Sequence, residues 1–317
     1  MGKSKGIGHL AALLTIMVWG TTYISTKVLL GDFKPIEILL FRSVIGYILL
    51  FLIKPGKLHL ENKKQEWIFA AAGLCGNCLY FLLENIALTY TLVSNVGVII
   101  SAAPFFTALL SRIFLKEEGR LHLSFFVGFA FAMVGIGMMS FSGTSSLKLS
   151  PKGDLLALGG AFVWACYCVL TKKISGCGYS TIQVTRRMFG YGILFMIPAA
   201  VIFDFRPRIS DLMLPVNFLN ILFLGVMASA VGFVAWNFAV QVLGAVRTSV
   251  YIYVSPVVTI VTSILVLNEK ITVVAAVGAG LALAGLILSE GRLDVKSYFT
   301  PKGREAMLKK LKWQKEE

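Results

Sequence analysis

The fold is decided by residues 67–118, which read WIFAAAGLCGNCLYFLLENIALTYTLVSNVGVIISAAPFFTALLSRIFLKEE. This stretch contains two long apolar runs, and its pattern returns in the same order 152 residues later. The recurring positions pair Asn85 with Asn237, Pro104 with Pro256, and Glu117 with Glu269. A repeat of this length indicates that one structural unit occurs twice, so the repeat has to be identified before any single element is assigned.

The composition places the chain among membrane proteins. Of its 317 residues, 57% are hydrophobic and 15% are charged. A single soluble core would not enclose so much apolar surface. The formal net charge is +14, but 8 of the 30 lysines and arginines follow residue 291 and most others fall in short connections. This distribution is typical of membrane orientation, so the expected partner is the lipid bilayer and not a nucleic acid.

Ten apolar runs are long enough to cross a bilayer core of about 30 Å. Basic residues are more frequent in the segments that would share a side with the two ends of the chain. We therefore expect a multi-pass protein of the cell membrane with both termini in the cytoplasm, and a basic tail on the anionic inner leaflet. The ten runs are 9–30, 36–54, 67–89, 93–115, 122–142, 154–174, 181–203, 218–241, 246–267 and 272–290.

The repeat extends to the first two runs of each half, with an offset of 145. It matches Trp19 with Trp164, Thr26 with Thr171, Lys27 with Lys172, and Arg42 with Arg187. Residues 1–145 and 146–290 are therefore predicted to form two five-helix units, followed by the tail 291–317. Because five is odd, the two units would enter the membrane in opposite directions. The fold class is an all-α membrane protein with inverted repeats, an arrangement typical of secondary transporters.

The doubled order of Trp, Arg, Asn-x-Ala, Pro and Glu resembles the EamA-like family of the drug/metabolite transporter superfamily. The resemblance covers roughly residues 9–290. It implies a ten-helix carrier for small metabolites, often amino acids or related compounds exported from the cell. It also implies that the first four helices of each unit line the cavity and that the fifth lies outside it.

Depth in the membrane predicts a substrate site without that resemblance. Several aromatic and small polar residues lie roughly 15 Å from their helix ends, or within a turn or two of that level. Lipid offers no hydrogen bonds to polar atoms there, so these atoms should face the protein interior. Helix-to-helix contact and core packing remain open as alternatives. The predicted substrate-binding residues are Trp19, Tyr23, Asn77, Tyr80, Ser101, Trp164, Tyr167, Arg187, Ser229 and Tyr253.

Two prolines at matching places predict kinks that could act as hinges. Pro104 and Pro256 each remove a backbone hydrogen bond and crowd the carbonyls of Ile100 and Ile252. A bound solute or water could satisfy these carbonyls, and so could a neighbouring helix. The sequence leaves both alternatives open.

Charged residues inside the runs are few, because an arginine or aspartate at the helix centre costs about 2.5 to 3.5 kcal/mol on the insertion scale. Arg42 and Arg187 lie about 9 Å from their helix ends, so both are interpreted as snorkelling to the interface. Arg186 has no charged counterpart in the first half, and one of the two adjacent arginines could meet a substrate carboxylate. Glu84 is expected near the outer surface.

No pattern in the sequence predicts catalysis, a metal or a cofactor. Cys75 and Cys78 form a CxxC motif, but it lies in an apolar run and no second ligand pair follows at metal spacing. The leading function is a secondary-active or facilitative carrier of small organic metabolites that works by alternating access. The alternative is a polytopic membrane enzyme or a membrane scaffold.

Small residues recur in the fifth run of each half, with Gly128 and Ala132 matching Gly280 and Ala284. Such spacing allows two helices to approach closely. The contact could lie within one chain or between two copies in a homodimer, and the sequence does not decide between them.

Overall fold

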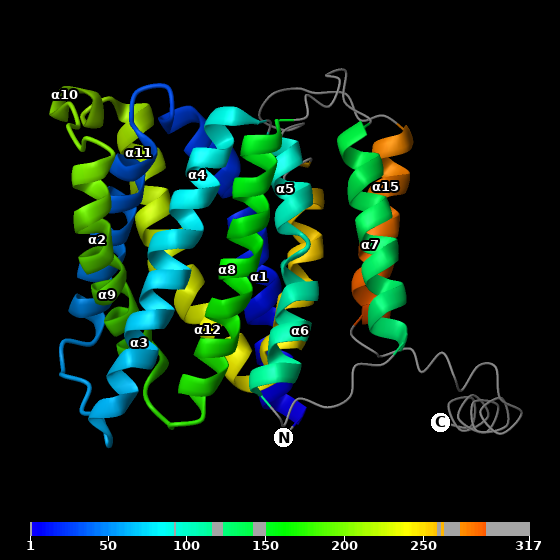
Figure 1. Ribbon diagram of the computed structural model, residues 1–317, viewed down its shortest axis with the longest axis horizontal. Coiled ribbons are helices and arrows are strands. Elements are labelled where there is room, and N and C mark those ends of the chain that lie inside the picture. Colours follow the sequence, from blue (N-terminus) through cyan, green and yellow to red (C-terminus); the bar gives the residue numbers. More distant parts are fainter. Residues whose placement is uncertain are drawn as a thin grey trace, which may run out of the picture.

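The computed structural model describes residues 2–91, 93–115, 123–141, 150–258, 261–262 and 273–289, and within these ranges it contains helices and no strand. The helices run roughly side by side as a bundle (Figure 1). Glu117, Glu269 and the tail 291–317 lie outside the described residues. The longer elements are α1 (Gly2–Leu29), α2 (Pro35–Ile53), α3 (Glu66–Gly73), α4 (Tyr80–Tyr90), α5 (Val93–Ile100), α6 (Ala103–Phe114), α7 (Leu123–Phe141), α8 (Pro151–Ser175), α9 (Thr181–Ile202), α11 (Pro215–Phe223), α12 (Gly232–Leu243) and α15 (Val273–Ser289).

Short elements connect these helices or continue them. They are η1 (Lys63–Gln65), η2 (Leu74–Leu79), α10 (Ile209–Leu212), η3 (Leu224–Val231), α13 (Ala245–Ser249) and η4 (Val250–Val254). Within the described ranges, five continuous helical stretches are long and apolar enough to cross a membrane, which fits the predicted class of polytopic membrane protein. These five are Lys5–Leu29, Pro35–Ile53, Lys63–Tyr90, Pro151–Ser175 and Pro215–Leu243.

The third predicted run of each half is a helix that widens in the middle. In the first half α3 passes into the π-helical segment η2 and then into α4, and in the second α11 passes into the π-helical segment η3 and then into α12. Residues 74–79 of η2 correspond, at the offset of 152, to residues 226–231 of η3. A π-helical turn inserts one residue and rotates the following side chains. This rotation changes which residues of α4 and α12 face inward.

The fourth run of each half is interrupted just before its proline. The α-helix α5 ends at Ile100, two turn residues follow, and α6 starts at Ala103 with Pro104 in its first turn. At the equivalent place of the second half, the 3₁₀ segment η4 precedes Pro256. Proline has no N–H and collides with the preceding turn, so a break or a tighter turn before it is expected. Both interruptions fall beside the cavity described below.

Close helix packing requires glycine at several crossings. A Cβ at Gly76 would lie 2.2 Å from the Tyr167 ring, and a Cβ at Gly73 would lie 2.3 Å from the Met188 carbonyl oxygen. Neither residue could carry a side chain without displacing α8 or α9. Glycine in the π-helical stretch therefore lets the first half press against the second.

The helices α7 and α15 lie side by side at one edge of the bundle (Figure 1). Their contact uses Gly128 and Gly135 on α7 against Gly285 and Gly278 on α15. Of the small residues singled out in the sequence, Gly128 therefore packs against α15 of the same chain. Gly280 does not take part in this contact, because no described atom outside its own helix backbone lies within 4 Å of where its Cβ would be. The register differs because α15 turns a neighbouring face, that of Gly278 and Gly285, toward α7.

We expect Gly135→Ala to destabilise the protein by about 1 to 3 kcal/mol, as overpacking does elsewhere. The added Cβ would lie 2.4 Å from the Gly278 carbonyl oxygen and 2.6 Å from the Ala282 nitrogen, and backbone atoms cannot rotate away. Gly137→Ala is the matched control, because no atom lies within 4 Å of that position and alanine favours helix. Thermal unfolding of the purified protein measures both, and equal melting temperatures for the two variants would contradict the close contact.

Candidate functional site

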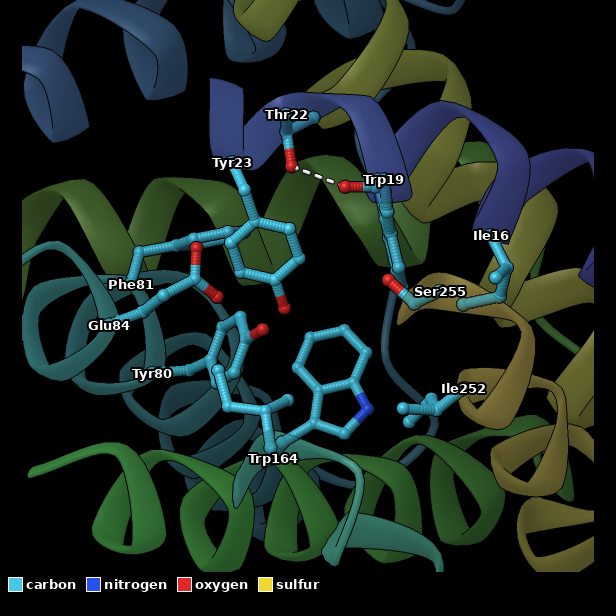
Figure 2. A pocket seen from close by; sticks show the side chains of 11 residues that line it. Ile16, Trp19, Thr22, Tyr23, Tyr80, Phe81, Glu84, Trp164, Ile252 and Ser255 are labelled. Carbon is cyan, nitrogen blue, oxygen red and sulfur yellow. Dashed lines mark hydrogen bonds between the residues drawn. The ribbon is translucent and has the colours of Figure 1, made fainter. Parts of the chain in front are cut away.

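A small cavity lies between α1, α4, α5, α8 and the segment that includes η4 (Figure 2). Its volume is about 30 Å³, which is room for a water molecule or two but not for an amino acid. Any larger solute therefore requires the walls to separate. The lining residues are Ile16, Trp19, Thr22, Tyr23, Tyr80, Phe81, Glu84, Ile100, Trp164, Ile252 and Ser255.

Aromatic rings form most of the wall. Trp19 of α1 and Trp164 of α8, which the repeat matches with each other, meet edge to face with ring centroids 5.2 Å apart. Tyr80 lies 4.7 Å from Trp164, and Trp236 of α12 packs behind Trp19 at 5.1 Å. Such pairs add about 0.5 to 1.5 kcal/mol each beyond the area they bury. The wall is therefore a packed cluster that joins the two halves of the chain.

The two indole groups are held differently. The Trp19 Nε1 donates a hydrogen bond of 2.9 Å to the Ala228 carbonyl in the π-helical segment η3. Gly232 makes room for this ring, since a Cβ there would lie 2.7 Å from the Trp19 Nε1. The buried Trp164 Nε1 has no hydrogen-bond partner among the described residues. Trp19 is thus anchored, whereas Trp164 offers a free donor.

Glu84 is buried in the cavity wall, with 2% of its surface exposed, and its expected depth near the outer surface of the membrane stays a prediction. It follows Tyr80 by one helical turn, so both side chains lie on the same face of α4. The Glu84 carboxyl lies beside the rings of Tyr23 and Tyr80 (Figure 2). The distance along the helix gives depth in the bundle but not the direction in which a residue faces, so the sequence did not predict this burial.

Arg42 is also buried, with 1% exposed, so its interpretation as a snorkelling residue is wrong. The Arg42 Nε donates a hydrogen bond of 3.0 Å to the Ser229 hydroxyl, and the guanidinium lies 4.0 Å from the centroid of the Phe81 ring. The Arg42 Nη2 has no partner among the described residues. Protein contacts across the bundle hold this charge away from the interface.

Arg42 and Glu84 form a separated pair of opposite charges. Each lies in the electrostatic field of the other, yet the described part of the chain contains no ion pair within 4 Å between them. Isolated buried charges are costly unless they are paired or hydrogen-bonded. The arrangement therefore leaves the Glu84 carboxyl group without a direct cationic partner among the described residues.

Four of the predicted substrate-binding residues line the cavity: Trp19, Tyr23, Tyr80 and Trp164. Tyr167 packs behind Trp164, with ring centroids 5.0 Å apart, and its hydroxyl donates a hydrogen bond to Asn237. It supports the wall from the next layer.

Four further predicted residues are buried but do not line the cavity. Ser229 accepts the hydrogen bond from Arg42, and the Asn77 Oδ1 accepts one of 3.3 Å from Ser43. Ser101 and Tyr253 each follow a lining isoleucine by one residue. The Ser101 hydroxyl bonds to the carbonyl of Gly97 on its own helix, which fits a structural role in the turn before Pro104.

Arg187 lies in a different place, at the start of α9. It forms an ion pair of 2.5 Å with Glu66 and donates to the Leu58 carbonyl, while Arg186 donates to the carbonyls of Lys54 and Gly56. A second, open cavity of about 520 Å³ lies beside these residues, bounded also by Tyr191. The two arginines therefore tie the connection between α2 and α3 to α9.

We expect Arg187→Gln to lower stability by about 1 kcal/mol, the scale of partly exposed ion pairs, because its side chain and that of Glu66 are 28% and 33% exposed. Glu66→Gln should cost a similar amount, and the double variant little more than either single change. A thermal-unfolding cycle of the three variants checks this. If Arg187→Gln instead weakens solute binding while stability is unchanged, a substrate carboxylate docks there.

A second polar cluster lies at the other end of the bundle. Lys34 donates a hydrogen bond of 2.9 Å to Asp204, which also pairs with Arg206 at 2.7 Å. The Lys34 ammonium, with help from Arg206, holds the pKa of the exposed Asp204 carboxyl below its usual range. Asn217 bonds to Asp32 at 2.8 Å. These contacts join the connection between α1 and α2 to the one between α9 and α11.

Sequence reasoning missed several lining residues, among them Glu84, Phe81 and Ser255. Helical spacing provides a signal for two sets of them, because Ile16, Trp19 and Tyr23 share one face of α1, and Tyr80 and Glu84 share one face of α4. Ser255 carries no such signal, since the chain leaves regular α-helix just before it. Within the described ranges, no three histidine, cysteine or acidic side chains come together as a metal site would require.

Sequence comparison assigns the chain to a family. The model of the EamA-like transporter family matches it twice, over residues 6–141 and 151–290. The chain belongs to the EamA-like transporter family. Its relatives include an uncharacterized transporter of Archaeoglobus fulgidus, 26% identical over 90% of this chain and 97% of that protein.

Two other relatives of this transporter carry more specific names. A probable terminal-alkyne amino-acid exporter of Streptantibioticus cattleyicolor is 26% identical over 89% of this chain and 93% of that protein. A probable amino-acid metabolite efflux pump of Escherichia coli K12 is 24% identical over 91% and 95%. A solved crystal structure with 17% identity has a TM-score of 0.73 and covers 95% of this chain and all of its own, which shows a shared fold.

Proposed function

We propose that this EamA-like transporter exports small organic metabolites, amino acids and related compounds among them, from the cell across the plasma membrane. The names of the relatives from Streptantibioticus and Escherichia support this solute class. The carrier works by alternating access around the cavity, with ten membrane helices arranged as two inverted five-helix units. The doubled family match and the matching π-helical segments η2 and η3 support the two-unit arrangement.

The observation that carries the proposal is the origin of the cavity wall. α1, α4 and α5 come from the first half of the chain, and Trp164, Ile252 and Ser255 come from the second. Secondary transporters built from inverted repeats place their sites at such an interface. A relative movement of the two halves would then open the cavity to one side or the other.

The interruptions before Pro104 and Pro256 supply the hinges in this proposal. Each lies next to a lining isoleucine, Ile100 or Ile252, so bending there would move the wall directly. The polar clusters of Arg187 with Glu66 and of Lys34 with Asp204 tie helices together at opposite ends of the bundle. Opening toward one side requires one cluster to separate while the other stays closed.

Counterflow tests the proposal. Purified protein in sealed vesicles preloaded with an unlabelled solute should accumulate the same labelled solute from outside, for at least one member of a panel of amino acids, amines and hydroxy acids. Trp164→Ala should lose this exchange. Exchange no faster than in protein-free vesicles, for a panel that includes every proteinogenic amino acid, would refute metabolite transport and favour an enzyme or a scaffold.

The orientation is tested separately. A reporter that is active only in the cytoplasm, fused to either end of the chain, should give a signal at both ends. A signal from the opposite side of the membrane at either terminus would contradict an even number of crossings with both ends inside.

A further inference from the structure

We infer that Glu84 is the specificity-determining residue of this carrier and that it selects solutes carrying an ammonium group. This inference rests on the proposed function. Among the described residues that line the cavity, Glu84 is the only one with a formal charge. The others are aromatic, aliphatic or hydroxyl-bearing. A buried carboxylate in such a wall is the natural partner of a cation that has left water.

The rings around Glu84 favour the same kind of ligand. Tyr23, Tyr80, Trp164 and Trp19 line the cavity together with the carboxylate, and Tyr80 packs against Trp164 (Figure 2). The face of an aromatic ring attracts a cation, most strongly for tryptophan, and the attraction grows when the cation is desolvated. An anionic solute would meet repulsion from Glu84 and from the negative ring faces. The wall therefore discriminates by charge sign.

The charged and titratable groups near Glu84 keep its carboxylate available. Arg42 of α2 acts on it from outside the cavity, because Arg42 stacks on Phe81 and bonds to Ser229. Tyr23 of α1 and Tyr80 of α4 present hydroxyl groups to it, whereas α8 and α5 present Trp164 and Ile100. Arg42 thus favours the carboxylate form from a distance without forming an ion pair with it, and the ammonium group of the solute supplies the direct cationic partner.

Lys27 of α1 does not compete for this role. Its ammonium donates a hydrogen bond of 2.8 Å to the Leu88 carbonyl and does not line the cavity. The cavity is also large enough for an ammonium group, because its volume of about 30 Å³ admits one or two water molecules, which are similar in size to such a group. The rest of a solute would occupy the room that opens when the aromatic wall separates.

The test uses matched solutes and one isosteric substitution. L-phenylalanine, 2-phenylethylamine, 3-phenylpropionate and 2-phenylethanol share a ring and differ in their ammonium and carboxylate groups, and lysine and ornithine with their hydroxy analogues extend the set. We expect the ammonium-bearing members to compete for counterflow at least about tenfold better than their analogues. In Glu84→Gln this preference should fall to less than about threefold, while Glu84→Asp retains part of it.

Two controls separate the outcomes. Glu61→Gln removes a carboxylate from an exposed loop and should leave the preference unchanged. Because Glu84→Gln removes the counter-charge of the buried Arg42, its melting temperature is expected to fall, and competition is therefore compared at equal amounts of folded, purified protein. Flux that does not favour ammonium solutes, or a preference that survives Glu84→Gln, overturns the inference but leaves transport standing. Loss of only the pH dependence of flux in Glu84→Gln, with the preference intact, also overturns it and assigns proton coupling to Glu84. No flux for any solute in any variant defeats the proposed function itself.

Discussion

We expect Arg42→Met to destabilise the protein by about 3 to 5 kcal/mol, the scale seen when one member of a buried charge pair is removed. Arg42 is 1% exposed, and its guanidinium is the positive charge that acts on the buried Glu84. Methionine keeps much of the stacking on Phe81 but leaves the Glu84 carboxylate without a counter-charge. The loss therefore comes from electrostatics more than from volume.

The double variant Arg42→Met/Glu84→Gln should recover a large part of this loss, because neither charge then remains buried alone. Arg206→Met is the matched control, since that side chain is 81% exposed and pairs with an exposed aspartate, so it should change stability by less than about 1 kcal/mol. Thermal unfolding in detergent measures all three variants. If Arg42→Met and Arg206→Met have the same melting temperature, the buried pair does not stabilise the fold.

Trp164→Ala should cost about 3 to 5 kcal/mol and abolish counterflow, because it empties the centre of the aromatic wall. Trp164 is 3% exposed and contacts Trp19, Tyr80, Tyr167 and Phe233. A cavity of this size does not close when its walls are held by other helices. Solute contacts with the ring are lost at the same time.

Phenylalanine at the two repeat-matched positions provides the control. Trp164→Phe keeps a ring and breaks no protein hydrogen bond, since the Trp164 Nε1 has no partner among the described residues. Trp19→Phe removes the hydrogen bond to the Ala228 carbonyl and leaves that buried acceptor without its donor. We expect Trp19→Phe to melt at the lower temperature. The opposite order would contradict the anchoring of Trp19, and full counterflow in Trp164→Ala would place the solute path elsewhere.

Apolar length and the internal repeat were sufficient to predict the all-helical membrane class and the family. The repeat also matched Trp19 with Trp164, and the rings of these two residues are in contact in the structure. The repeat did not reveal that the third run of each half widens into a π-helical segment. Hydropathy does not detect this change, since the composition of the run stays apolar while the backbone hydrogen bonds shift from i→i+4 to i→i+5.

The buried charges show where sequence reasoning fails. Depth along a helix led to the interpretation of Arg42 as snorkelling to the interface, yet its side chain is buried in the bundle, and so is that of Glu84. Depth along a helix does not give the direction in which a side chain points. That direction depends on the rotation that η2 introduces and on partners such as Ser229 from the other half. Arg187 illustrates the converse case. It matches Arg42 in the repeat but binds Glu66 in the partly exposed connection between helices, because its surroundings are not duplicated.

The central claim is that the cavity is the transport site and is reached in turn from both sides of the membrane. Thr22→Cys, in a chain whose five native cysteines are replaced, places a thiol on the cavity wall with little change in volume. A membrane-impermeant maleimide, applied to one face of sealed vesicles at a time, should label this thiol from either face, and a transported solute should slow both reactions. Labelling from one face only, with no protection by the solute, would contradict the account.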